Sequence, residues 1–299
     1  MPHRRERPAL RCPSRLAVSR SRCATVGNGD IWTSELLSKT DMCPTTQPPL
    51  PGFIIIGAQK SATRWLRVNL GRHPEVYAAT SELGYFDHKT RLARGGVGWY
   101  RAQFSEFGGK PIVGEATPGY LMWRNSPGLV ASRIHELLPD VRLIAVLRDP
   151  VDRANSAMIH HIKQERLPPS ATLREMVERM PPEHDRLGLV TGGWYAASLA
   201  PFRRRFGEKL LVLLYDDVKN DPAGVYEEAL RYVGVDSNFH PPELNEVVYS
   251  NQQGESNGRW KLSVDDRREL YEYFRDDVRQ LEEMIERDLS MWEPRVGSS

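Results

Sequence analysis

The stretch GAQKSATR at residues 57–64 contains residue types that can bind a phosphate or sulfate group. It follows the apolar run GFIII (52–56) and precedes a segment with helical spacing, so the first backbone N–H groups of that helix lack intrahelical partners. Anion oxygens would satisfy these groups, and Lys60 would add a positive charge. A Walker A loop would need a second glycine directly before the lysine. The stretch therefore predicts an anion site without the Walker A pattern.

Two further polar clusters follow strand-like segments. Arg148 ends the apolar run RLIAVLRD (142–149), with Ser156 two turns into the next helix, and SNGRWK (256–261) forms a glycine-containing loop. Ligands of open parallel sheets bind beyond the carboxyl ends of the strands, where these clusters would meet. Because Pro150 starts the next helix, we expect the Arg148 guanidinium to lie beside the N-terminal amides of that helix.

Alternating strands and helices are predicted from residue 51 to residue 292. We expect strands at 53–57, 110–115, 141–149 and 209–218 and helices at 62–71, 126–139, 150–165, 221–235 and 263–287, the last of them capped by Ser263. A less regular helical region covers 172–206. This order predicts an α/β fold, a single P-loop-like domain with a central parallel sheet and helices on both faces.

The first 50 residues predict a disordered, basic and proline-rich N-terminal tail, because they lack apolar periodicity. A transit peptide and an early start site remain alternatives. All three cysteines, Cys12, Cys23 and Cys43, lie in this tail, which leaves the predicted domain without a disulfide and fits a reducing, cytoplasmic compartment.

The overall composition limits the possible partners. The 41 basic and 39 acidic side chains nearly balance, which gives no support to a role in nucleic-acid binding. No apolar run reaches the roughly 20 residues of a membrane span, so no transmembrane segment is predicted. No pattern indicates an oligomeric state.

Five motifs occur in an order that resembles a known enzyme family. IIIGAQKSATRWL (54–66), SELGYFDH (81–88), GEATPGY (114–120), RLIAVLRDPVDRANSAM (142–158) and NGRW (257–260) are similar to segments of the sulfotransferases that use 3′-phosphoadenosine 5′-phosphosulfate (PAPS). The likeness is greatest to the heparan sulfate glucosaminyl N- and 3-O-sulfotransferase branch, with this chain as a bacterial-type member. The resemblance implies in-line sulfuryl transfer from PAPS to a hydroxyl or amine, without a metal.

The resemblance also implies roles for individual residues. Glu82 would be the general base, Lys60 would stabilise the leaving phosphate, and Asp87 would contact the acceptor. The residues implied in PAPS binding are Lys60, Ser61, Ala62, Thr63 and Arg64 at the 5′-phosphosulfate, Arg148 and Ser156 at the 3′-phosphate, and Asn257, Gly258 and Arg259 in the late loop.

This chain departs from the heparan sulfate branch at two positions. Ala116 and Asn257 stand where that branch has lysines, and no cysteine is available for the disulfide of the Golgi enzymes. We therefore expect an acceptor other than heparan sulfate, such as a bacterial-type small molecule, glycolipid or saccharide.

Two other functions remain as alternatives. A P-loop small-molecule kinase would need Mg²⁺ ligands, and Asp149 at the end of an apolar run could be one of them. A nucleotide-binding module without catalysis is the third possibility, although such a module would be expected to lose Lys60 or Glu82.

The remaining histidine and aromatic side chains that stand out in the sequence can be explained by packing. The pair HH at 160–161 lies within a predicted helix without matching metal ligands. The aromatic residues at 99, 100, 104 and 107 are predicted to lie in the core. Trp194 and Tyr195 could line an acceptor cleft or simply pack.

Overall fold

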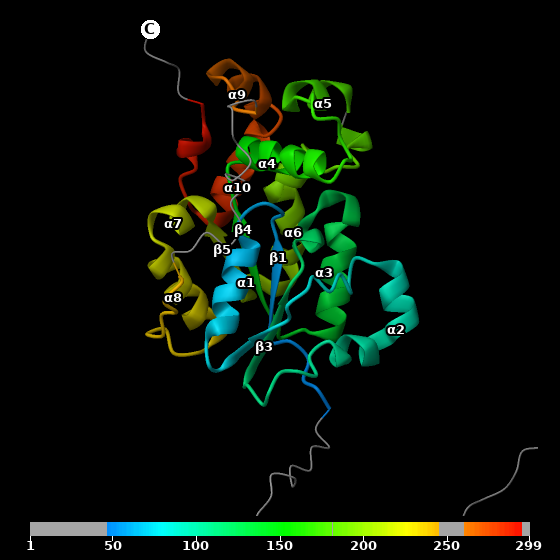
Figure 1. The fold of residues 1–299 in the computed structure, drawn as a ribbon, viewed down its shortest axis with the longest axis vertical. Coiled ribbons are helices and arrows are strands. Elements are labelled where there is room, and N and C mark those ends of the chain that lie inside the picture. The colour runs from blue at the N-terminus through cyan, green and yellow to red at the C-terminus, as the bar shows by residue number, and fades with distance from the viewer. Residues whose placement is uncertain (1–46, 181, 245–259, 295–299) are drawn as a thin grey trace, which may run out of the picture. The chain divides into compact units, whose positions relative to one another are not determined.

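The computed structural model describes residues 47–180, 182–244 and 260–294, which form an α/β fold (Figure 1). Five parallel strands make one sheet in the order β2-β3-β1-β4-β5. The strands are β1 (Phe53–Gly57), β2 (Val76–Ala78), β3 (Ile112–Ala116), β4 (Arg142–Leu147) and β5 (Leu210–Leu214). This sheet confirms the predicted fold class.

Ten α-helices are present in the described ranges. They are α1 (Thr63–Arg72), α2 (Lys89–Ala102), α3 (Pro127–Leu137), α4 (Pro150–Lys163), α5 (Leu173–Arg179), α6 (Tyr195–Phe206), α7 (Tyr215–Asn220), α8 (Pro222–Val233), α9 (Val264–Tyr271) and α10 (Arg275–Ile285). A short 3-10 helix, η1 (Pro118–Leu121), follows β3. None of the helices in the described part is both long and apolar enough to cross a bilayer.

Each face of the sheet has its own hydrophobic core. Successive residues of a strand point to opposite faces, so Ile54 and Ile56 of β1 join one core while Phe53 and Ile55 join the other. Side chains of α3 and α6 pack on the first face, and side chains of α1 and α8 pack on the second. Ala58 of the turn after β1 belongs to the first core and Ala62 packs against the second, which fixes the position of that turn.

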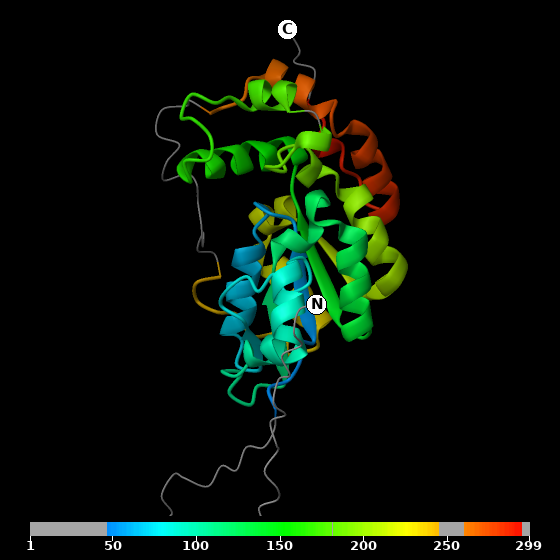
Figure 2. The ribbon, with the colours of Figure 1, turned by 90° about the vertical axis from the view of Figure 1, so that its right-hand side faces the viewer.

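The carboxyl ends of the central strands point toward a separate group of helices. Helices α4, α5 and α9 lie together beyond this edge of the sheet (Figures 1 and 2). Because α1 begins just after β1 and α4 just after β4, the first residues of both helices meet at this edge. The first two predicted clusters therefore lie at the expected edge of the sheet, whereas residues 256–259 of the third lie outside the described residues.

Several elements differ from the sequence prediction. Strand β2 and helix α2 were not predicted, because β2 has only three residues and α2 contains a glycine pair, with Gly96 at a positive φ of 54°. The predicted strand 209–218 ends at Leu214, where α7 begins.

The predicted last helix, 263–287, is two helices. Ser263 caps α9 in a reciprocal capping box with Asp266, as the sequence suggested. The chain then turns at 272–274, where Phe274 is buried in the core and α10 starts in a new direction.

The N-terminal boundary of the described chain contacts the domain. The Pro48 carbonyl accepts a hydrogen bond of 3.0 Å from Arg101, and Leu50 packs against the core. The rest of the predicted tail, 1–46, lies outside the described residues.

Candidate active site

The turn between β1 and α1 presents backbone amides at the carboxyl edge of the sheet. The Ala58 amide donates to the Val146 carbonyl at 2.8 Å, which ties the start of the turn to β4. Lys60 and Ala62 adopt left-handed conformations, with φ of 71° and 65°. Such non-glycine residues cost on the order of 1–3 kcal/mol each and gather at functional sites. No capping side chain and no acidic residue compete for the first-turn amides of α1, so this helix end suits an anion.

Positive charge converges on this turn. Lys60 is half-buried, and its pKa is lowered by burial and by repulsion from Arg148 and Lys163. Burial, with Lys60 as the next cause, lowers the pKa of His160 to about 4, so this imidazole is neutral at pH 7. The three cations come from the β1 turn, the end of β4 and the last turn of α4, and an anionic ligand would relieve their mutual repulsion.

Arg148 is held in place by two tyrosines. The Tyr195 hydroxyl donates to the Arg148 carbonyl at 2.9 Å, and the Arg148 guanidinium lies over the Tyr215 ring at 4.8 Å from its centroid. Asp152 is 3.8 Å away across an ion pair. The buried Nε of Arg148 has no hydrogen-bond partner within the described part of the chain. The guanidinium is therefore oriented by packing and keeps donor capacity for a ligand.

Arg148 lies beside the first turn of α4, where it pairs with Asp152, but two amides of this turn already have a partner. The Asp149 carboxylate caps this helix and accepts from the Val151 and Asp152 amides at 2.8 and 3.0 Å. Burial, followed by repulsion from Asp152, raises the pKa of Asp149 to about 6. An anion at Arg148 would therefore meet side chains there rather than the N-terminal amides of α4.

Other buried polar atoms near this edge also lack partners among the described residues. They are Gln59 Oε1, Asn155 Oδ1 and Trp260 Nε1. The Asn155 amide donates to the Trp260 carbonyl at 2.9 Å. This bond attaches Trp260, at the start of the last described range, to α4. Buried polar atoms are normally paired with protein, water or ligand atoms, so these atoms can accept or donate bonds to a polar ligand.

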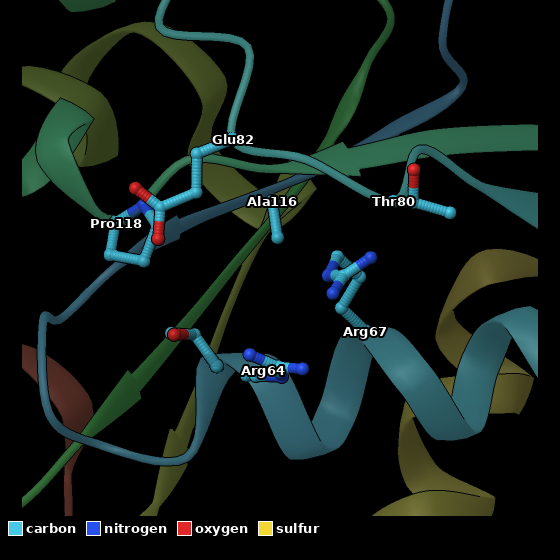
Figure 3. Close-up of a pocket in the computed structure, with 7 residues that line it drawn as sticks. Arg64, Arg67, Thr80, Glu82, Ala116 and Pro118 are labelled. Atoms are coloured by element: carbon cyan, nitrogen blue, oxygen red, sulfur yellow. The ribbon is translucent and has the colours of Figure 1, made fainter. Parts of the chain in front are cut away.

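A cavity of about 230 Å³ opens between α1 and the loop after β2 (Figure 3). Figure 3 shows the Arg64 and Arg67 guanidinium groups rising from the helix and Glu82 lying above them on the loop. The lining residues are Thr63, Arg64, Arg67, Thr80, Glu82, Ala116 and Pro118. The cavity thus places a carboxylate opposite two cations of α1.

Glu82 is exposed at the rim of this cavity, yet protein surrounds one side of it. Partial burial raises the pKa of its carboxyl, Arg67 opposes that shift, and Asp87 adds to it. Arg67 donates to the Ala79 carbonyl at 2.9 Å, which holds the helix against the loop. A carboxylate with a raised pKa is a stronger base, as proton abstraction requires.

The structure brings most of the predicted site residues together. Thr63 and Arg64 line the cavity with Glu82, and Lys60 and Arg148 are close enough to repel each other. Ser61 is fully buried next to the Tyr195 hydroxyl.

The other predicted residues lie around this centre. Ala62 is the left-handed residue before α1, and Ser156 is half-buried on α4. Asp87 accepts from the Asn125 amide at 3.1 Å and is not among the seven residues that line the cavity. The predicted Asn257, Gly258 and Arg259 lie outside the described residues.

The aromatic and histidine residues singled out in the sequence have structural roles. Tyr100 and Phe104 are fully buried, and Trp99 and Phe107 pack against the same core. Tyr195 is also fully buried, and Trp194 donates to the Tyr273 carbonyl. The His161 Nε2 lies 3.2 Å from the Leu187 carbonyl. Groups of three or more His, Cys, Asp or Glu able to hold a metal do not occur in the part of the chain searched, 47–294 apart from its gaps.

Several residues at the site, among them Arg67, Gln59, Lys163 and Asn155, were not among the sequence candidates. Arg67 follows Arg64 by three residues, which places both on one face of a helix. This spacing could have identified Arg67 from the sequence. Gln59 sits within the motif that was singled out. Lys163 and Asn155 are recognisable only once the direction of α4 is known.

Comparisons with known proteins agree with this geometry. Residues 50–257 match the family described as "Sulfotransferase domain". Human heparan sulfate glucosamine 3-O-sulfotransferase 6 is 31% identical over 186 residues, which cover 62% of this chain and 52% of the relative. The human bifunctional heparan sulfate N-deacetylase/N-sulfotransferase 3 is 26% identical over 296 residues, which cover 88% of this chain and 32% of that protein.

A solved structure gives the same answer for the fold. The crystal structure of a sulfotransferase from Alicyclobacillus acidocaldarius superposes with a TM-score of 0.67 at 28% identity, covering 82% of this chain and 99% of that one. The chain spans about half the length of the 3-O-sulfotransferases it matches. With the family match extending over more than half of its residues, the chain belongs to the sulfotransferase family.

Proposed function

We propose that this protein transfers a sulfuryl group from PAPS to a hydroxyl or amine of a saccharide, glycolipid or small-molecule acceptor. The observation that carries the proposal is the adjacency of two sites. A cationic edge with unpaired buried polar atoms lies at the turn that leads into α1, and the first residues of α1 line a cavity that contains a carboxylate.

The residues at the cationic edge fit the nucleotide donor. PAPS carries phosphate groups at both ends of its ribose, and cations from the β1 turn and from β4 lie at this edge. Lys60 and the α1 amides would hold the 5′-phosphosulfate, and Arg148 the 3′-phosphate. The unpaired Gln59, Asn155 and Trp260 atoms offer further polar contacts.

The cavity fits the reacting end of an acceptor. Its volume of about 230 Å³ is below the roughly 300–1,000 Å³ that encloses a drug-sized ligand, so the remainder of a larger acceptor would lie outside. Arg64 and Arg67 contribute two positive charges against one negative charge on Glu82, which favours acceptors with an acidic group near the reacting hydroxyl or amine.

The proposed chemistry assigns one task to each side of the cavity. PAPS supplies the sulfuryl group. Glu82 takes the proton from the acceptor hydroxyl or amine as its oxygen or nitrogen bonds to sulfur. The bond between sulfur and the bridging phosphate oxygen breaks, and Lys60 stabilises the charge that grows on that oxygen. The lowered pKa of Lys60 indicates a poorly solvated ammonium, which interacts more strongly with an oxyanion than a hydrated one.

The structure favours this reading over a kinase. Asp149, the one candidate for a Walker-B carboxylate, caps α4 and forms an ion pair of 3.5 Å with Arg267. A carboxylate with these partners is poorly available for Mg²⁺. We further propose a cytoplasmic location, from the placement of the cysteines.

An acceptor screen tests the proposal. Purified protein is incubated with PAPS labelled in its sulfate and with a panel of monosaccharides, glycosaminoglycan oligosaccharides, phenols and amines, each in acidic and neutral versions. Label should pass to at least one acceptor with wild type and fall to near background with Glu82→Gln. Absence of transfer across the panel, together with phosphate transfer from ATP and Mg²⁺, would replace this proposal with the kinase.

A further inference from the structure

A buried carboxylate lies directly behind the cavity. Glu115 is on β3 and is completely buried. Its Oε1 accepts hydrogen bonds from the Tyr100 and Tyr120 hydroxyls at 2.6 and 3.1 Å, and its Oε2 accepts from the Thr117 hydroxyl at 2.7 Å. Three neutral donors thus surround one buried acid. Burying a carboxylate costs free energy that such hydrogen bonds only partly offset, so we expect this group to have a function.

Two of these hydroxyls hold the loop that carries Glu82. The Thr117 Oγ1 accepts from the Leu83 and Gly84 amides at 3.1 and 3.2 Å, and the Tyr120 hydroxyl accepts from the Tyr85 amide at 2.9 Å. These three amides directly follow Glu82 in the chain. The network therefore connects the buried acid to the backbone beside the carboxylate of the cavity.

We propose that Glu115 is a positioning residue for Glu82, acting through Thr117 and Tyr120 to fix the backbone that follows Glu82 against the floor of the cavity. This inference rests on the proposed function, since it assigns a purpose to the position of the base. The residues that flank Thr117, Ala116 and Pro118, form part of that floor, so one short segment shapes the cavity and holds its base.

The number of donors and acceptors around Glu115 matches its ionised form. A hydroxyl offers one donor and two acceptor positions. Thr117 uses both acceptor positions for the Leu83 and Gly84 amides and its hydrogen for Glu115. If Glu115 were protonated or replaced by an amide, one hydroxyl would face a second donor and would have to turn. Turning the Thr117 or Tyr120 hydroxyl would disturb the bonds to the loop.

The ionisation of Glu115 supplies a second signature. Burial raises its pKa to about 7, although the three hydroxyl donors oppose that shift. The ionisable groups that face it are Tyr100 from α2, Tyr120 from η1 and, farther off, Asp87 from the loop. Burial raises the pKa of both tyrosines well above their usual range. Both remain donors, so loss of the carboxylate charge below pH 7 should loosen the loop.

A matched pair of variants tests the connection. Thr117→Val keeps the shape and removes the hydroxyl, whereas Thr117→Ser keeps it. In the Val variant the Leu83 and Gly84 amides should exchange with solvent about tenfold faster or more. The kcat with the best acceptor of the screen should also fall about tenfold or more, while calorimetric affinity for 3′-phosphoadenosine 5′-phosphate (PAP) stays unchanged. The Ser variant should behave like wild type in all three measurements.

Tyrosine variants and a pH profile separate positioning from general stability. Tyr120→Phe should speed exchange at the Tyr85 amide and lower kcat. Tyr100→Phe removes one hydrogen bond to Glu115 but none of the bonds to the loop amides. This variant should therefore keep a kcat plateau near that of wild type. The kcat profile of Glu115→Gln should lack the component that titrates near pH 7 in wild type.

The outcomes distinguish this inference from the proposed function. If wild type transfers sulfuryl groups but Thr117→Val and Thr117→Ser are equally active, with equal amide exchange, the positioning role is wrong and the proposed function stands. If wild type transfers no sulfuryl group, the proposed function fails, and amide exchange alone still decides whether the network anchors the loop.

Discussion

The buried Glu115 on β3 should contribute a fall in the stability of the protein as the pH rises from 5 to 8, and Glu115→Gln should remove that contribution. The pKa of Glu115 is raised to about 7 in the folded protein, from a usual value of 4.5. Between these values the folded chain holds a proton that the unfolded chain has lost. The contribution of Glu115 to stability is therefore greatest below pH 4.5 and falls until the pH passes the folded pKa.

The size of the effect follows from the two pKa values. A difference of about 2.5 pKa units corresponds to about 3 kcal/mol in total, of which about 2.5 kcal/mol is lost between pH 5 and pH 8. Other titrating groups, such as Asp149 with its raised pKa, contribute equally to both proteins and cancel in the difference. The Gln variant can differ from wild type at every pH through its altered hydrogen bonds, so the comparison uses the change with pH.

Urea unfolding at pH 5, 6, 7 and 8 measures this change. The free energy of unfolding of wild type should fall by about 2.5 kcal/mol more than that of Glu115→Gln across the series. Glu136→Gln, which removes an exposed carboxylate from α3, controls for the loss of one charge and should follow wild type. Parallel curves for wild type and Glu115→Gln would refute the reasoning, because they would mean that Glu115 is ionised as easily in the fold as in the unfolded chain.

Three further predictions concern the proposed catalytic residues, Glu82 and Lys60, and the N-terminal tail. Glu82→Gln should lower kcat by roughly 10²–10⁴-fold with PAP affinity near wild type; if activity persists, Asp87 is the next candidate for the base. Lys60→Ala should weaken PAP binding and lower kcat together, because the lysine would contact the donor before and during the reaction, and a change in kcat alone would argue against donor contact. A chain starting at Gln47 should keep its thermal midpoint and PAP affinity, because residues 1–46 supply no apolar periodicity; a clear drop in the midpoint would show that the tail belongs to the fold.

The parts of the fold that the sequence predicted are those with strong local signals. The apolar runs of β1 and β4 are buried on both faces, and proline at the start of α3, α4 and α8 marks where these helices begin. The missed elements have weak signals, since β2 is three residues long and α2 is interrupted at Gly96. The break between α9 and α10 follows from burial of Phe274, which is a tertiary effect.

In the candidate site, too, residues with a strong local sequence signal were predicted and residues that depend on tertiary contacts were not. Lys60 and Arg148 were predictable because each follows a strand at the ligand edge of the sheet. The occupation of the α4 amides by Asp149 was not predicted, although an aspartate before a helix-starting proline is itself a capping signal. Glu115 could not be recognised, because the sequence does not show that a carboxylate in GEATPGY is buried or which hydroxyls surround it.

The central claim is that this chain binds a nucleotide with a 3′-phosphate as its donor, and binding can be measured without knowing the acceptor. Calorimetric titrations of PAP, AMP and ATP with Mg²⁺ into wild type and Arg148→Ala test it most directly. A charge-assisted contact of the Arg148 guanidinium is worth about 1.5–3 kcal/mol. Wild type should therefore bind PAP at least about tenfold more tightly than AMP, and Arg148→Ala should lose most of that difference. Equal affinities of wild type for PAP and AMP, or tighter binding of ATP with Mg²⁺ than of either, would contradict the account.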